Sequence, residues 1–181
     1  KWAKLITAFG ASDSKHTTKT KNMDYINGSL YLSGMMKGGF APYGEEEARI
    51  ASKSTPLNGF VIKCDASNGE WLGGVSADEQ GIGGYFGVAK GKENNLYSYG
   101  YSWATPNKGI CLTTIDESSW EKTEKIALIT ETGMGTAWSC LADGTNFYSF
   151  SRGNKAVNFY NSEFTLPAPT GWGMFISSWK L

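Results

Sequence analysis

The stretch that decides the fold runs from Trp71 to Ser119 and reads WLGGVSADEQGIGGYFGVAKGKENNLYSYGYSWATPNKGICLTTIDESS. It contains four apolar or alternating runs separated by Gly, Pro, Asn and Asp, the pattern of short strands joined by tight turns. Related units begin at Trp2 and Trp120, so the pattern occurs three times. A strand-rich unit that recurs along a chain indicates a repeat architecture.

The three units predict strands in the same order. The first unit predicts strands at 1–7, 17–25, 30–34 and 59–65, with Asn27-Gly28 as a hairpin turn. The second unit predicts strands opening at Trp71-Leu72 and following at 85–89, 96–102 and 109–116, and the third predicts strands at 125–130, 137–142, 147–150 and 173–181. Two long insertions, 37–58 and 152–172, interrupt the first and third units, and a short helix is expected around Glu45–Ile50 in the first insertion.

Three tyrosines align the units with one another. Tyr31, Tyr97 and Tyr148 each follow an apolar residue and are expected at equivalent strand positions. Two residues further on, the aligned positions hold Ser33, Tyr99 and Phe150. The alignment also matches Gly59-Phe60-Val61-Ile62 with Gly109-Ile110-Cys111-Leu112 and Gly173-Met174-Phe175-Ile176, and it matches Trp2, Trp71 and Trp120.

The size of the unit predicts the fold class. A four-stranded unit of about 40–50 residues is the size of one β-propeller blade. Units 1–69, 70–119 and 120–181 therefore predict one all-β domain, a β-propeller of three four-stranded blade-like repeats. A β-trefoil, which also has three four-stranded units, is the alternative. The uneven unit lengths and a strand order that begins with an outer strand favour the propeller.

The first unit carries a family resemblance. Its pattern is Trp, a Gly-rich link, N-G-x-L-Y-x-x-G, G-F-V-x-K-x-D and G-x-W, carried by Trp2, Asn27-Gly28, Leu30-Tyr31, Gly34, Gly59–Lys63, Asp65 and Trp71. This pattern resembles the bacterial β-propeller repeats of the seven-bladed "SBBP" type. The resemblance implies a propeller on a secreted, periplasmic or cell-surface bacterial protein, and it brings no catalytic residues. The third unit departs from the pattern, because Trp179 stands where the first unit has Asp65.

Composition excludes several classes of function. Seventeen basic and seventeen acidic residues balance, so no net field favours nucleic acid or an anionic membrane. Cys64, Cys111 and Cys140 lie in strand-like runs without a C-x-x-C spacing and are interpreted as buried thiols. No apolar run approaches the ~20 residues of a transmembrane helix. The chain starts with Lys1 and shows no signal peptide, as expected of a mature or trimmed product.

No catalytic or metal-binding signature is present. His16 is the single histidine, which argues against histidine metal clusters and most His-based catalytic triads. We therefore expect no metal, no cofactor and no catalytic residues. The alternative is a polysaccharide hydrolase or lyase that uses two loop carboxylates for acid/base chemistry.

The insertions supply the candidate ligand-binding residues. In a propeller the insertions and the link 103–108 are expected on one face of the ring. They hold both arginines of the chain and several aromatic residues, a combination typical of recognition surfaces. The candidates are Tyr43, Arg49, Trp103, Arg152, Tyr160 and Trp172. In the competing interpretation, these aromatics pack the insertions onto the blades and Arg49 pairs with Glu45–Glu47. The function expected is non-catalytic binding or adhesion, with a protein or a glycan as the ligand.

Three blades do not close a ring, since propellers usually have ~4–8. The first strand, 1–7, is an outer strand without a blade before it, and the last strand, 173–181, lacks an outer neighbour. Two copies of the chain that share these strands would give a six-bladed ring. The alternative is that the chain is a piece of a longer propeller. Both versions predict association with further copies or further blades.

Overall fold

The computed structural model describes residues 1–9, 19–51, 57–77, 82–102, 109–130, 136–159, 163 and 165–181. The protein is all-β, as predicted, and the elements within these ranges are all strands. The predicted helix around Glu45–Ile50 is wrong. Residues 43–48 form turns and bends, and Ile50 begins a strand. Gly44, with a φ of 95°, turns the chain just after Pro42. The Arg49 N–H donates back to the Phe40 carbonyl at 2.9 Å, so this segment is a loop between two strands.

The strands form four antiparallel sheets. Sheet one has the order β2 (Lys19–Ile26), β3 (Ser29–Met36), β6 (Asn58–Asp65), β7 (Trp71–Ser76). Sheet two contains β8 (Ile82–Lys90), β9 (Asn95–Ser102), β10 (Gly109–Asp116) and β11 (Lys122–Thr130), extended by β14 (Val157–Phe159) and β15 (Thr165–Leu166). Sheet three has the order β12 (Thr136–Ala142), β13 (Asn146–Gly153), β16 (Gly173–Lys180). The insertion sheet has the order β1 (Ile6–Phe9), β4 (Gly39–Pro42), β5 (Ile50–Ala51).

Turn chemistry sets the first hairpin. Asn27 and Gly28 join β2 to β3 with φ angles of 48° and 82°, the left-handed pair that a two-residue hairpin turn requires. This prediction is confirmed. The strand that opens each later unit pairs with the sheet formed by the unit before it: β7 pairs with β6, and β11 with β10.

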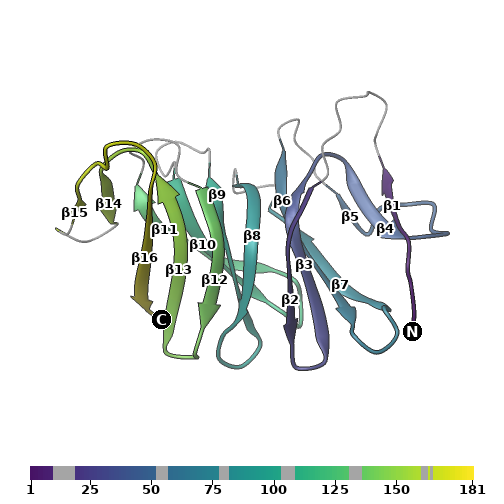
Figure 1. The fold of residues 1–181 in the computed structure, drawn as a ribbon. Helices are drawn as coiled ribbons and strands as arrows, with labels where there is room; N and C mark the ends of the chain where they lie inside the picture. Colours follow the sequence, from purple (N-terminus) through teal and green to yellow (C-terminus); the bar gives the residue numbers. More distant parts are fainter. Residues whose placement is uncertain are drawn as a thin grey trace.

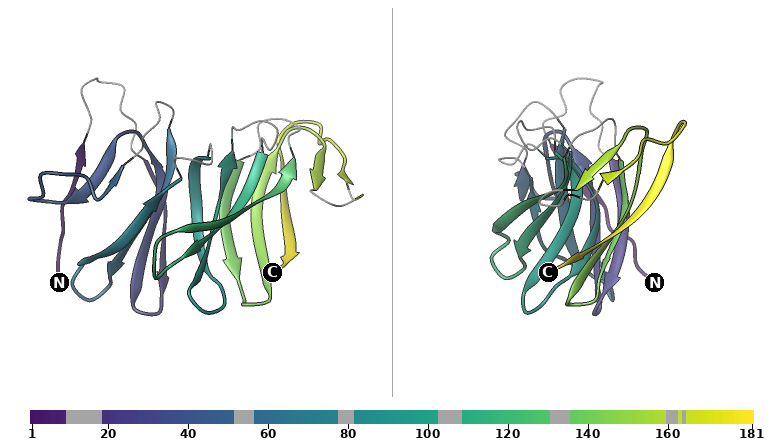
Figure 2. Two further views of the ribbon diagram at one scale, coloured as in Figure 1. Left: turned by 180° about the vertical axis from the view of Figure 1, so that it is seen from behind. Right: turned by 90° about the vertical axis from the view of Figure 1, so that its left-hand side faces the viewer.

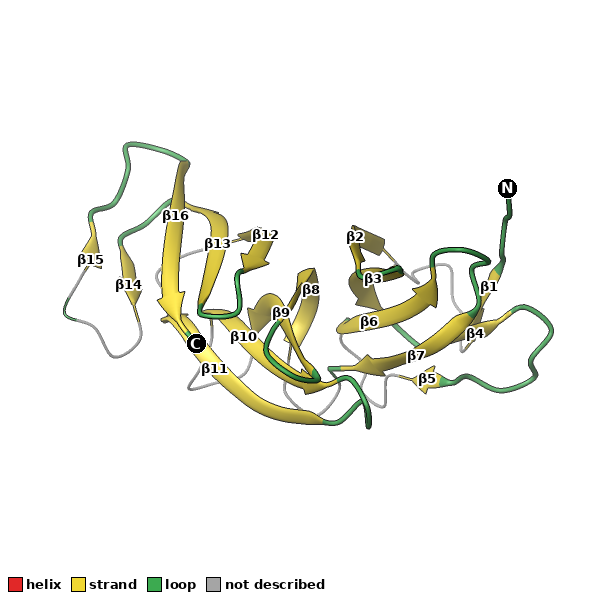
Figure 3. Ribbon diagram, turned by 90° about the horizontal axis from the view of Figure 1, so that it is seen from below, coloured by secondary structure: helices red, strands yellow, loops and turns green. Residues whose placement is uncertain are grey.

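The three repeat sheets lie side by side in a row (Figure 1). Seen from below, β2, β8 and β12 run along one side of the row, while β7 and β11 run along the other (Figure 3). We call the face of a sheet that points toward the next sheet in chain order its forward face, and the opposite one its backward face. In sheet three, the backward face is the one that packs on sheet two, and the forward face is the one that points away from it. The forward face of sheet one (Tyr31, Val61, Val75) packs on the backward face of sheet two (Val88, Leu96, Ile115).

A second core joins sheets two and three. The forward face of sheet two packs with Phe147 of sheet three, through Tyr99, Tyr101, Ile110 and Leu112. The Tyr99 and Ser151 hydroxyls also hydrogen-bond between these sheets. A third core lies at the other end of the row, where Phe40 and Ile50 of the insertion sheet cover Phe60 and Ile62 on the backward face of sheet one. The rings of Phe40 and Phe60 pack edge to face, 5.1 Å apart.

Strand register confirms the tyrosine alignment. Tyr31 lies opposite Lys63, Tyr97 opposite Thr114, and Tyr148 opposite Ser178. Two residues toward the start of β6, β10 and β16, the equivalent positions are therefore Val61, Leu112 and Ile176. The glycine-led match predicted from the sequence is wrong by one residue in the first unit, because it matches Val61 with Cys111. A one-residue slip moves a side chain to the other face of the sheet, and a glycine at a strand start does not fix register.

The tryptophan match is also wrong. Trp71 lies in β7, whereas Trp120 lies in the turn before β11 with a φ of 60°. In the equivalent turn of sheet one this left-handed position belongs to Gly69, with a φ of 72°. In both turns its backbone N–H donates to the carbonyl of the aspartate that starts the turn, Asp116 or Asp65. The two turns are thus the same structure, offset from the tryptophan spacing.

The insertions form strands that the sequence did not predict. The first supplies β4 and β5, and β4 pairs with β1. The second supplies β14 and β15, and β14 pairs with β11 of sheet two. The first strand was expected at 1–7 but spans Ile6–Phe9, because its hydrogen-bonding partner is β4.

Candidate functional site

Both long insertions leave the repeat sheets at the same edge. The first connects β3 to β6 and the second connects β13 to β16. Figures 1 and 2 show both at the upper edge of the row, at its opposite ends. The sequence predicted a shared face for the insertions, and the structure divides its candidate residues into two groups along this edge.

The group at the sheet-three end consists of Arg152 and Trp172. Arg152 lies in β13 opposite Met174, and its guanidinium carbon lies 4.6 Å from the centre of the Trp172 ring. A planar guanidinium over an indole face is a favourable cation–π contact. Trp172 remains 49% exposed, so its ring is available for contact with a further group.

The group at the sheet-one end consists of Tyr43 and Arg49. The backbone N–H of Tyr43 donates to the carbonyl of Leu5 at 3.0 Å, and its side chain is 73% exposed. Arg49 donates from Nε to Glu45 Oε2 at 2.8 Å and from Nη2 to Oε1 at 2.5 Å. This two-point ion pair is the one that the competing interpretation of Arg49 expected, and it orients the guanidinium.

Tyr43 and Arg49 border a hollow at this end of the row. Its volume is about 820 Å³, and it lies between the N-terminal segment and the backward face of sheet one. Apolar residues of the sheet line it, namely Met23, Leu30, Leu32 and Cys64. Trp2 closes one side, and its indole N–H donates to the carbonyl of Ala66 at 3.1 Å. The hollow therefore has an apolar floor and a mixed rim.

Two of the predicted residues, Trp103 and Tyr160, lie outside the described residues. Of the four others, Arg152 and Trp172 contact each other, and Tyr43 and Arg49 border the same hollow; these are called the two residue pairs below. One chain does not bring these pairs together, because they lie at opposite ends of the row (Figure 2).

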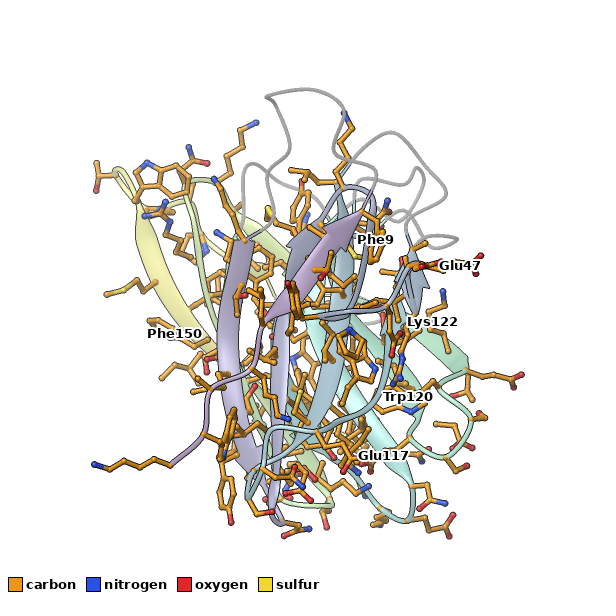
Figure 4. The ribbon with its side chains drawn as sticks, turned by 90° about the vertical axis from the view of Figure 1, so that its right-hand side faces the viewer. Phe9, Glu47, Glu117, Trp120, Lys122 and Phe150 are labelled. Atoms are coloured by element: carbon orange, nitrogen blue, oxygen red, sulfur yellow. The ribbon has the colours of Figure 1, made fainter. Side chains whose placement is uncertain are left out.

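Sequence reasoning missed a charge cluster between sheets one and two. Glu117, in the turn after β10, forms ion pairs with Lys63 of sheet one and Lys90 of β8, and it accepts a hydrogen bond from the Tyr31 hydroxyl. Figure 4 shows Glu117 and Trp120 toward the lower edge, away from the insertions. Burial alone would raise the pKa of Glu117, but hydrogen bonds from Lys63, Lys90 and Tyr31 outweigh it and lower the pKa to about 2.

The same cluster raises the pKa of Tyr31, through burial and then through the neighbouring Glu117 carboxylate. The Tyr31 hydroxyl is therefore neutral and donates a hydrogen bond to the ionised carboxylate. An ionised carboxylate between two ammonium groups clamps the sheets but has no proton to exchange near neutral pH. We interpret the cluster as structural. No signal marked it in the sequence, since its members are ordinary residues from three separate strands and a turn.

Within the described part of the chain, no three His, Cys, Asp or Glu side chains gather as metal ligands. The same residues contain no helix long and apolar enough to cross a membrane. Asp24 has a raised pKa, caused by burial between sheets one and two, where its carboxylate accepts from the Val88 N–H at 3.0 Å. It faces a packed interface and not the hollow.

No protein-family model matches the chain, and a search of curated proteins finds no significant match.

Proposed function

We propose that this protein is a non-catalytic binding module that recognises a glycan through its insertion-bearing edge. The carrying observation is the Arg152–Trp172 stack, a half-exposed indole held by a guanidinium at 4.6 Å. A flat aromatic ring already ordered by its neighbour offers contact area at little entropic cost, and pyranose rings have flat apolar faces that suit it. Tyr43 offers a second exposed ring on the same edge.

The fold we propose for this module is an arc of a β-propeller, with sheets one, two and three as consecutive blades. Three observations support it. The sheets stack face to face in chain order, and β2, β8 and β12 run together along one side of the row. The strand along the other side of sheet one, β7, is supplied by the unit that follows it. Propellers commonly bind ligands with the loops at one end of the blades. The resemblance of the first unit to bacterial propeller repeats is the basis for proposing a secreted, periplasmic or cell-surface location.

The competing function is a polysaccharide hydrolase or lyase with two loop carboxylates. Glu45 and Glu70 both border the hollow, which favours this class. However, Arg49 engages both oxygens of Glu45, and a carboxylate held in a two-point ion pair is a poor general acid. A polysaccharide depolymerised by the wild-type protein, with loss of activity in Glu70→Gln, would establish the enzyme instead.

The binding proposal is tested with a glycan array followed by titration of the strongest oligosaccharide. We expect Trp172→Ala and Arg152→Ala each to weaken binding by at least about fivefold, the effect of losing more than ~1 kcal/mol. Leu72→Ala, at an exposed apolar position of β7 away from both groups, is the matched control and should bind as wild type. Unchanged affinity in both edge variants would exclude this edge, and binding to proteins alone would replace the glycan by a protein ligand.

A further inference from the structure

Sheet three exposes the face that its two counterparts bury. On its forward face, Met174 and Ile176 are 75% and 76% exposed, and Leu141 is also exposed. The equivalent residues of sheet two, Ile110 and Leu112, are buried against sheet three. At the position of Ile176, sheet one has Val61, which is buried against sheet two. The bare face is therefore the same surface that carries both internal junctions.

Sheet one leaves part of the complementary face open at the other end of the row, in the hollow that the N-terminal segment borders. By register, Met23, Leu30 and Cys64 are equivalent to Val88, Leu96 and Ile115 of sheet two. In sheet two these residues receive the preceding sheet. In sheet one they line the hollow of about 820 Å³, and Met23 is largely exposed. The insertion sheet packs on the rest of this backward face around Phe60 and Ile62, and its core extends as far as Cys64.

We propose that a second copy of the chain fills the hollow with the forward face of its sheet three. Forward-on-backward packing occurs twice within the chain, and every copy carries one bare forward face and one partly bare backward face. Two copies can satisfy both pairs of faces in a closed ring of six sheets, within the usual ~4–8 blades. Sheet faces stacked in this way bury apolar surface across a layer of about 10 Å, as in β-sandwiches.

Charge permits this junction. In the internal junction between sheets one and two, the Lys63 ammonium of the forward face requires Glu117 opposite it. The forward face of sheet three has Ser178 at the position of Lys63, and the turn of sheet one has Ala66 at the position of Glu117. At these two positions the proposed junction therefore contains neither the lysine nor the glutamate, so no charge is left unpaired by the absence of its partner.

The junction completes the ligand site, and this part of the inference rests on the proposed function. Arg152 lies near the end of β13 on the forward face with Trp172 against it, and Tyr43 and Arg49 border the hollow. Both insertions lie at the upper edge of the row (Figure 1), so stacking that keeps the internal orientation would bring the upper edges of the two copies together. The two residue pairs that one chain holds apart then flank one junction, each copy contributing half of the binding site.

The test uses sedimentation velocity of the 19.7 kDa chain from about 1 to about 100 µM. Wild type should form a dimer. Ile176→Glu on the forward face and Met23→Glu in the hollow should each weaken association at least about 100-fold, since each buries an unpaired carboxylate. Both positions are exposed in the single chain, so the variants should fold, as circular dichroism can verify. Leu72→Glu, outside the hollow, should dimerise normally.

Mixing the two blocked variants identifies which faces meet. The Met23→Glu chain keeps a sound forward face and the Ile176→Glu chain keeps a sound hollow. The mixture should therefore form a one-to-one dimer through that single junction, weaker than wild type because the other junction holds both carboxylates, whereas neither variant alone has an intact junction. A monomeric wild type would overturn the proposal. A dimer insensitive to Met23→Glu would also overturn it, because two forward faces would then be packing on each other. Glycan binding is measured separately, so loss of that function with dimerisation intact would reject only the shared binding site.

Discussion

Strands β10 and β16 occupy the same place in two neighbouring sheets and have different surroundings. Ile110 and Leu112 of β10 are 2% and 1% exposed, whereas the equivalent Met174 and Ile176 of β16 are 75% and 76% exposed. The residue types are similarly apolar at both sites. The same apolar pattern is therefore buried in one sheet and bare in the other, as the proposed packing of a second copy requires.

The largest expected difference between these strands is in stability. Leu112→Ala should lower the free energy of unfolding by about 3 kcal/mol, because it opens a cavity between sheets two and three. Ile176→Ala should lower it by less than about 1 kcal/mol at a protein concentration low enough to keep the chain monomeric, because the side chain is then exposed. Urea unfolding curves measure both. Equal effects would mean that β16 is already covered within the single chain.

A second comparison concerns the charge cluster that fastens sheet one to sheet two. The pKa of Glu117 is about 2 in the folded protein against 4.5 ordinarily, so its ion pairs stabilise the fold above pH 4.5. This contribution, on the order of 2 kcal/mol, should disappear as the pH falls from about 4.5 toward about 2. Glu117→Gln should be less stable at pH 7 and should show a flatter pH dependence over that window. Parallel curves for the two proteins would contradict the assignment.

The smallest effect concerns the turn in which Gly69 occupies the left-handed position that Trp120 occupies in the equivalent turn of sheet two. Gly69 has a φ of 72°, and a Cβ there would lie 2.5 Å from the Trp2 ring, so Gly69→Ala should cost about 1–2 kcal/mol. Gly28→Ala is the control: its φ is 82°, but nothing lies within 4 Å of the added methyl group. Thermal unfolding should place Gly69→Ala below Gly28→Ala. The reverse order would argue that Trp2 does not pack over this turn.

The strands of the repeat were predictable because turn residues separate them. Asn27-Gly28 located the first hairpin, and the three tyrosines gave the correct register between units. The tryptophan match failed because Trp120 occupies a left-handed turn position that is normally held by glycine. Such a backbone state is not visible in a spacing of tryptophans.

Long-range pairing was not predictable. Strand β1 pairs with β4, a four-residue strand within an insertion, and β14 has three residues, too short for a periodic signal. Of the candidate site, the sequence identified an arginine and an aromatic residue in each insertion but not their pairing. The cation–π contact of Arg152 and the ion pair of Arg49 depend on side-chain geometry that residue types alone leave open.

The most direct test of the central claim is the urea midpoint of unfolding measured across protein concentrations from about 1 to about 100 µM. If a second copy covers the bare face of β16, unfolding is coupled to dissociation and the midpoint should rise with concentration. Ile176→Glu should abolish that dependence while leaving the low-concentration midpoint nearly unchanged. A wild-type midpoint that stays constant over the whole range would contradict the claim.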